Sequence, residues 1–235
     1  MSHICKVRGG LGTQLMSLCT DYAEYGTHVT KILYCLQGYL PEHQKVMKTE
    51  VIGRKYLENI LNFHSDITFI GDGGGKTSLA LERLEHMLLF REDVLSLASI
   101  KEAKGFSDNI LHVRKWDSDL LNDDDYKYLI DKYNCQHIIT DNPEYCKTFG
   151  LKMSEDPENE TLDWLRLANS SVTCTGPYST FTLMAAFYNP NLDLKVLVKD
   201  EQYDEKIWGG NQKAQSNDRV VELFVKYLDN VSYVW

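Results

Sequence analysis

The chain has 235 residues, of which 43% are hydrophobic and 25% are charged, a composition typical of a globular protein with a hydrophobic core. Its 34 acidic and 25 basic residues give a formal net charge of -9, which disfavours nucleic acid and anionic membrane surfaces as partners. A nucleotide stays compatible with this charge, because a few backbone amides and one arginine hold phosphate at short range.

The cysteines and the N-terminus bear on the cellular compartment. No pair among the 6 cysteines has the C-x-x-C spacing of metal and redox sites. The N-terminus has no long apolar region, and no stretch of the chain approaches the roughly 18 apolar residues of a membrane span. We therefore expect reduced thiols, no membrane span and a cytoplasmic location.

The first half of the chain predicts an α/β domain. Strands are expected over Ile4–Val7 and Val29–Leu36, with a glycine loop and a helix ending at Gly26 between them. Further helices are expected over Lys55–Leu61 and Ser78–Phe90. The mixed, polar stretch 91–108 is interpreted as the interdomain link, with domains over residues 1–105 and 106–235.

The second half alternates short β-rich runs with helical stretches. Strands are expected over Ile110–Val113, His137–Thr140, Ser171–Cys174 and Leu194–Val198. Helices are expected near 124–133, 143–149, 162–168 and 180–188. Such alternation indicates right-handed crossovers and a parallel sheet, whose ligands bind beyond the carboxyl ends of the strands.

A glycine-rich loop, Gly9-Gly10-Leu11-Gly12-Thr13-Gln14, joins the first expected strand to its helix. Glycines there let the backbone approach a ligand, and the helix N-terminus offers free amides to a phosphate or a sugar hydroxyl. A plain tight turn is the alternative interpretation.

The run Ile110–Arg114 ends in His112 and Arg114, which lie on the same face of a strand because they are two residues apart. The arginine fork is suited to a diphosphate, and the imidazole to a base or ribose. An ion pair between Arg114 and Asp117 is the structural alternative.

Two later turns each open a helix after a strand. In the first, the Asp141 carboxylate either caps the helix or accepts the two N–H groups of a guanine edge. In the second, Gly176–Phe181, the hydroxyls of Ser179 and Thr180 either cap the helix or hold phosphate oxygens.

Residues 71–77, Gly-Asp-Gly-Gly-Gly-Lys-Thr, resemble a P-loop but miss its pattern by one residue. The first glycine of that pattern would fall at Ile70, so the wrap of amides around a phosphate would be one unit short. A glycine turn is the preferred interpretation, and a P-loop NTPase stays a remote alternative.

Taken in order, these segments resemble the motifs of the fucosyltransferase superfamily, especially the alpha-1,2-fucosyltransferases of glycosyltransferase family 11. That family carries Gly-Gly-Leu-Gly-Asn-Gln, matched at residues 9–14 with Thr13 in place of Asn, and His-x-Arg-x-Gly-Asp, matched at residues 112–117 with Trp116 in place of Gly. Its later Ser/Asp turn resembles residues 140–142, and its Asn-Ser-Thr-Phe-Ser-Trp-Trp-Ala-Ala segment resembles residues 178–186.

The resemblance implies an α/β, GT-B-like fold, in which two Rossmann-like domains with mostly parallel sheets face a cleft. The N-terminal domain would face the acceptor and the sugar, and the C-terminal domain would bind the nucleotide. The implied activity is inverting transfer of L-fucose from GDP-fucose to a glycan hydroxyl, without a metal or other cofactor.

The resemblance also implies roles for individual residues. Arg114 would neutralise the β-phosphate of the leaving GDP, and His112 and Asp141 would contact guanine. Ser179, Thr180 and Phe181 would complete the phosphate site. Gly10, Gly12, Thr13 and Gln14 would form the donor-facing loop of the first domain.

Three questions stay open from the sequence. Asp117 and Asp119 are candidates for the group that accepts the proton of the acceptor hydroxyl, although either of them could instead orient Arg114. Thr13 and Trp116 leave room for a donor other than GDP-fucose. A non-catalytic protein that binds a nucleotide or a glycan is the alternative of a different class.

Overall fold

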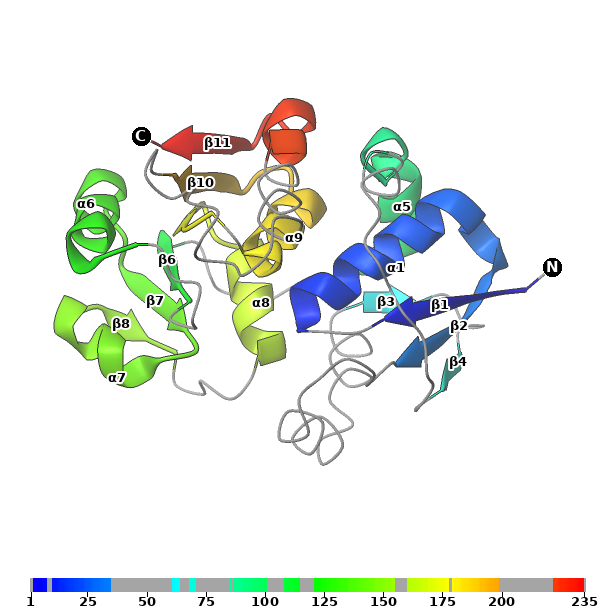
Figure 1. Ribbon diagram of the computed structural model, residues 1–235, viewed down its shortest axis with the longest axis horizontal. Coiled ribbons are helices and arrows are strands. Elements are labelled where there is room, and N and C mark those ends of the chain that lie inside the picture. The colour runs from blue at the N-terminus through cyan, green and yellow to red at the C-terminus, as the bar shows by residue number, and fades with distance from the viewer. Residues whose placement is uncertain are drawn as a thin grey trace, which may run out of the picture. The chain divides into compact units, whose positions relative to one another are not determined.

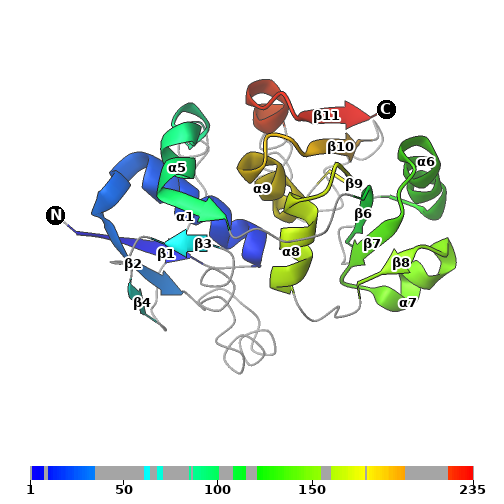
Figure 2. The ribbon, with the colours of Figure 1, turned by 180° about the vertical axis from the view of Figure 1, so that it is seen from behind.

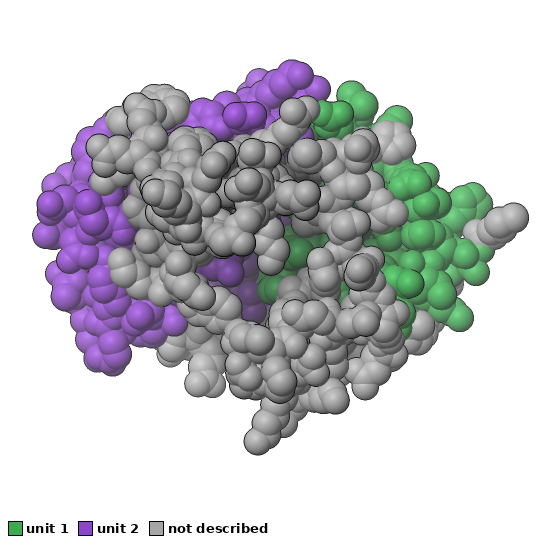
Figure 3. Space-filling view, viewed as in Figure 1, with its two compact units in different colours: residues 1–101 green, residues 102–235 purple. Residues whose placement is uncertain are grey.

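The structure is a computed structural model. It describes residues 2–7, 10–34, 61–63, 68–70, 85, 87–100, 108–114, 121–154, 160–177, 179–198 and 222–234. The chain divides into two compact units, residues 1–101 and 102–235, which are coloured separately in Figure 3. The expected boundary between residues 105 and 106 lies outside the described residues. Among the described helices, none is both long enough and apolar enough to cross a membrane.

The first unit begins with a strand, a helix and a parallel strand. Strand β1 (His3–Val7) leads into helix α1 (Leu11–Tyr25), and a 3-10 turn (Gly26–His28) leads into β2 (Val29–Tyr34). Strand β4 (Thr68–Ile70) pairs with the other edge of β2, so the parallel sheet has the order β1-β2-β4 (Figure 1). Gly26 ends α1 with a φ of 53°, a conformation that favours glycine. The first strand, the first helix and most of the second strand are thus confirmed.

Residues 91–100 are not the interdomain link that the sequence suggested. Helix α5 (Arg91–Leu97) and strand β5 (Ala98–Ile100) occupy them, and β5 pairs with β3 (Leu61–Phe63) in an antiparallel ladder. The acidic residues that suggested a linker lie in the first turn of α5, where they favour the helix dipole, and Val94 on the same helix is fully buried. Leu61, expected to end a helix, begins β3, and the rest of that expected helix lies outside the described residues.

The second unit has a six-stranded sheet in which all described pairings are parallel. Its strands are β6 (Ile110–Val113), β7 (His137–Thr140), β8 (Lys152–Met153), β9 (Val172–Thr175), β10 (Asp193–Leu197) and β11 (Val231–Val234). The spatial order is β11-β10-β9-β6-β7-β8. Counted from β6, this is the 3-2-1-4-5-6 order of a Rossmann-like, doubly wound sheet.

Helices cover both faces of this sheet. They are α6 (Asp123–Tyr133), α7 (Pro143–Cys146) followed by a 3-10 turn (Lys147–Phe149), α8 (Glu160–Ala168), α9 (Thr180–Tyr188) and the helical residues 222–227. In both ribbon views α6 and α7 lie on one side, and α8 and α9 lie beside each other on the other (Figures 1 and 2). Leu111 and Val113 of β6 belong to the core that includes Tyr126 and Leu129 of α6.

The expected α/β class with mostly parallel sheets is therefore confirmed, and so are the strands and helices expected between residues 110 and 198. The sequence interpretation missed two strands of this sheet, β8 and β11. The GT-B arrangement of two domains around a cleft stays a prediction.

Candidate functional site

The candidate site lies where the chain order of the strands in the second sheet reverses. Strand β6 lies between β7, which follows it in the chain, and β9, which begins the second half of the sheet. In open parallel sheets, ligands bind outside the carboxyl ends of the strands at such a reversal. His112, Arg114, Thr175 and Gly176 all lie at or just beyond the carboxyl ends of β6 and β9.

His112 links three elements at this point. Its neighbours Leu111 and Val113 face the core under α6, so the imidazole points to the opposite face. There its Nδ1 lies 3.2 Å from Oγ1 of Thr175 on β9, and its ring stacks on Phe181 of α9 with centroids 5.6 Å apart. The contacts join the His112 motif to the first turn of α9, which is distant in the sequence.

The imidazole of His112 is neutral at physiological pH. Only 7% of the residue is exposed, and burial is the main reason why the pKa of His112 falls to about 3. The positive charge of Arg114 lowers this pKa further. His112 therefore acts through hydrogen bonds and packing, and it does not carry a proton in or out near pH 7.

Arg114 follows β6 directly and is exposed. Its influence on the pKa of His112 places its charge close to the imidazole that packs against α9. A guanidinium in this place has a planar fork of N–H donors at the carboxyl end of β6. Such a fork is suited to a diphosphate.

The turn before α9 provides hydroxyls and amides at the same edge. Ser179 is the N-cap of α9, its Oγ accepts the backbone N–H of Thr182 at 3.3 Å, and only 4% of the residue is exposed. Thr180 is the first helical residue and is half-buried. Ser179, one of the predicted phosphate residues, is thus a capping residue. Its hydroxyl oxygen accepts the helix amide, and its O–H can donate one further hydrogen bond.

Close packing fixes this turn. A Cβ at Gly176 would lie 3.3 Å from Cδ1 of Leu121, so the backbone there passes close to the side chain of Leu121, two residues before α6. The carbonyl of Phe181 accepts a 3.0 Å hydrogen bond from the indole Nε1 of Trp164, which is fully buried. Trp164 and Thr175 carry no motif signal, and sequence reasoning missed both.

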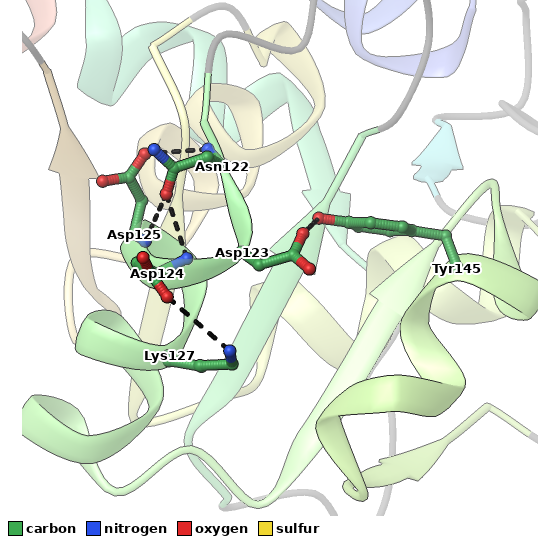
Figure 4. A network of polar contacts seen from close by, with 6 residues as sticks. All are labelled: Asn122, Asp123, Asp124, Asp125, Lys127 and Tyr145. Carbon is green, nitrogen blue, oxygen red and sulfur yellow. Dashed lines mark hydrogen bonds and ion pairs between the residues drawn. The ribbon is translucent and has the colours of Figure 1, made fainter.

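The N-terminus of α6, at the same sheet edge, has a different character. Asn122 caps this helix by accepting the N–H groups of Asp124 and Asp125, and the Asp125 carboxylate accepts the N–H of Asn122 (Figure 4). The third aspartate of this turn, Asp123, accepts the phenol of Tyr145 at 2.5 Å. Three carboxylates in one turn repel an anion, whereas the first turn of α9 contains no acidic residue.

Asp141 follows β7, the strand beside β6, and is exposed. The cap of α7 is the next residue, Asn142, whose Oδ1 accepts the N–H of Tyr145 at 3.1 Å. The capping interpretation of Asp141 is therefore wrong, and its carboxylate lies one residue outside the capped turn.

The remaining predicted residues divide between the first unit and the undescribed parts of the chain. In the first unit Gly10 is the N-cap of α1, Gly12 and Gln14 are buried in its first turn, and Thr13 is half-buried. Asp117, Asp119, Trp116 and the glycine turn 71–77 lie outside the described residues.

No protein-family model, no curated protein and no solved structure matches this chain.

Proposed function

We propose that the chain is an inverting, metal-independent glycosyltransferase that moves L-fucose from GDP-fucose to a hydroxyl of a glycan. The observation that carries this proposal is the contact of His112 with both Thr175 and Phe181. This contact brings the strand end that carries Arg114 to the first turn of α9 at the reversal of the sheet. Two motifs with phosphate-binding chemistry thus meet where this fold class binds nucleotides.

The charges at the two nearby helix N-termini support one place for the diphosphate. In the proposal, the phosphate binds at the first turn of α9, which has no acidic residue, and at the guanidinium of Arg114, two residues after His112. It is repelled by the three aspartates that begin α6. The helix after the first strand is where a dinucleotide fold holds its pyrophosphate, so these aspartates argue against a nicotinamide-dependent dehydrogenase.

In the proposed reaction, the acceptor hydroxyl oxygen attacks the anomeric carbon of the donor sugar. The bond between that carbon and the β-phosphate oxygen breaks, and GDP leaves with the bonding electron pair. Negative charge grows on the diphosphate as it leaves, so Arg114 and the amides of α9 stabilise the transition state more than the bound donor. The proton of the hydroxyl passes to a base, for which Asp117 and Asp119 stay the candidates.

In the proposal, the nucleoside is bound at the carboxyl ends of β6 and β7. Asp141 is exposed beyond β7, and the proposal assigns its carboxylate to the N–H groups of a guanine edge. His112 is almost completely buried, so little of the residue is left for a nucleotide to contact.

The proposal is tested first by nucleotide binding. Calorimetry should show tighter binding of GDP than of UDP or ADP, and Arg114→Ala should weaken GDP binding by about tenfold or more, because hydrogen bonds to a charged group are worth about 1.5–3 kcal/mol. Arg114→Lys keeps the charge but loses the fork, so we expect an intermediate affinity. Lys127→Ala removes an exposed cation on α6 that pairs with Asp124 and serves as the control. Equal binding of the three nucleotides, or unchanged GDP affinity in Arg114→Ala, would contradict the proposal.

Turnover then separates the proposal from its alternatives. A screen of GDP- and UDP-sugars for hydrolysis and for transfer to glycans identifies the donor that is consumed. Release of GDP from GDP-fucose supports the transferase. Binding of GDP without turnover of any sugar donor would instead identify a non-catalytic binding protein.

A further inference from the structure

Trp164 contacts α9 near both ends. Its indole N–H donates to the carbonyl of Phe181 in the first turn, and its ring packs edge-on against Tyr188, the last residue of the helix, with centroids 5.7 Å apart. Phe181 and Tyr188 are two turns apart and lie on the same face of α9. One fully buried side chain of α8 therefore fixes the position of α9 along its own axis.

The same residue, Phe181, also contacts β6. Its carbonyl is held by Trp164, and its ring is held by His112 of β6. His112 lies two residues before Arg114, and the charge of Arg114 lowers the pKa of His112. Phe181 thus connects the position of α9 to the strand end that carries the guanidinium.

We propose that Trp164 is a positioning residue for the donor diphosphate: it holds the first turn of α9 in register with Arg114 through Phe181 and His112. This inference rests on the proposed function. An indole N–H in a protein interior takes some acceptor in any case. The acceptor here belongs to the turn assigned to the phosphate. We therefore expect loss of the bond to move the groups proposed to contact the distal phosphate and to leave Asp141, the proposed guanine contact beyond β7, in place.

The experiment compares Trp164→Phe with wild type in the full chain. Phenylalanine keeps a ring against Tyr188 and removes the N–H donor. We expect the Kd for GDP to rise about three- to tenfold, in line with one lost hydrogen bond, while the Kd for GMP stays within about twofold because GMP lacks the distal phosphate. In turnover, the same variant should raise KM for the donor and lower kcat.

A matched variant separates positioning from general stability. Leu167→Ala removes packing from the same buried face of α8, one turn away from Trp164. We expect Leu167→Ala to lower Tm at least as much as Trp164→Phe does and to leave the affinity ratio of GDP to GMP unchanged. An equal loss of GDP affinity in both variants, or equal weakening of GDP and GMP by Trp164→Phe, would overturn the inference.

The outcomes distinguish this inference from the proposed function. If wild type does not bind GDP, both fail. If wild type binds GDP with the expected loss in Arg114→Ala but Trp164→Phe binds like wild type, only the role of Trp164 fails. If Trp164→Phe does not fold, the NMR resonance of the Trp164 indole N–H in nitrogen-labelled wild type provides the test. A chemical-shift change with GDP and none with GMP supports the inference. Equal changes with both nucleotides overturn it.

Discussion

His112 is a buried imidazole whose neighbours keep it uncharged. Burial contributes most to this, and the adjacent Arg114 adds to it, so that the pKa falls from 6.5 to about 3. A side chain of this kind resists protonation only as long as the protein stays folded. His112 therefore makes the free energy of unfolding depend on pH.

The folded state binds a proton at His112 only near pH 3, whereas the unfolded chain does so near pH 6.5. Between these values the unfolded state binds more protons, so stability is fully present above pH 6.5 and falls as the pH falls toward 3. From pH 8 to pH 5 this residue should lower the free energy of unfolding by about 2 kcal/mol. Urea unfolding at the two pH values measures the loss.

The variant His112→Gln removes the titrating group and keeps a polar side chain near Thr175. We expect its free energy of unfolding to be about 2 kcal/mol less sensitive to the change from pH 8 to pH 5 than that of wild type. The two proteins differ only at residue 112, so the difference between their losses isolates the contribution of His112. The same loss in both proteins would show that His112 is protonated in the folded state.

At the scale of elements, the side chain of Asn230 holds the start of the last strand of the second sheet by hydrogen bonds. Its Nδ2 donates to the carbonyls of Ala186 and Asn189 at 3.0 Å and of Leu192 at 2.8 Å. These carbonyls lie at the end of α9 and just before β10, and β11 begins at the residue after Asn230. One amide therefore connects a helix end to the two strands at this edge.

Replacing Asn230 with alanine leaves three partly buried carbonyls without this donor. We expect Asn230→Ala to lower the free energy of unfolding by about 2–3 kcal/mol, and Asn230→Asp by more, because it turns a carboxylate toward the same oxygens. Asn169→Ala, which removes a single bond to the Leu165 carbonyl, should cost only about 1 kcal/mol. Urea midpoints at constant slope provide the comparison, and equal losses for Asn230 and Asn169 would contradict it.

The elements that could be predicted from the sequence are those with strong local signals. Strand β6 is a short apolar run, and α9 begins at a serine cap before a nearly continuous apolar segment. Strand β8 is only two residues, Lys152 and Met153, and a pattern of period two cannot appear in so short a run. Helix α5 was missed because its acidic first turn was interpreted as polar linker, although the buried Val94 gave the counter-signal.

At the scale of the whole molecule, the predicted site residues divide between two units. Arg114, Asp141 and the first turn of α9 belong to residues 102–235, and the loop Gly10–Gln14 belongs to residues 1–101. The proposal accordingly gives the nucleotide to the second unit and the sugar to the loop of the first. Substitutions in the two units should then affect different steps.

Thr13→Val tests this division of roles. The Thr13 side chain is half-buried at the start of α1, and valine keeps its shape while removing the hydroxyl. We expect kcat/KM for sugar transfer to fall by about tenfold, the value of one hydrogen bond, while the Kd for GDP changes by less than about twofold. Steady-state kinetics and calorimetry measure the two quantities. A loss of GDP affinity as large as that of Arg114→Ala would place the loop at the nucleotide instead.

The sequence indicated which types of side chain could form the site, and it could not indicate how they are held. The spacing of His112 and Arg114 predicted that both lie on one face of a strand, and in the structure Arg114 is the first residue after β6. The contacts of Thr175 and Trp164 arise from the order of the strands and from packing between helices, which no local pattern records. The contact of His112 with the guanine base stays a prediction, and in the structure its side chain contacts Thr175 and Phe181.

The pairing of β6 with β9 also has a consequence for biosynthesis. As the chain leaves the ribosome, β6 and β7 emerge well before Val172–Thr175, so the central strand of the sheet has one edge without a partner during that interval. All four residues of β6 are buried in the finished protein, and nascent chains that end before β9 should therefore aggregate or recruit chaperones. The pairing of β9 with β6, which assembles the proposed nucleotide site, thus also covers the open edge of β6 in the growing chain.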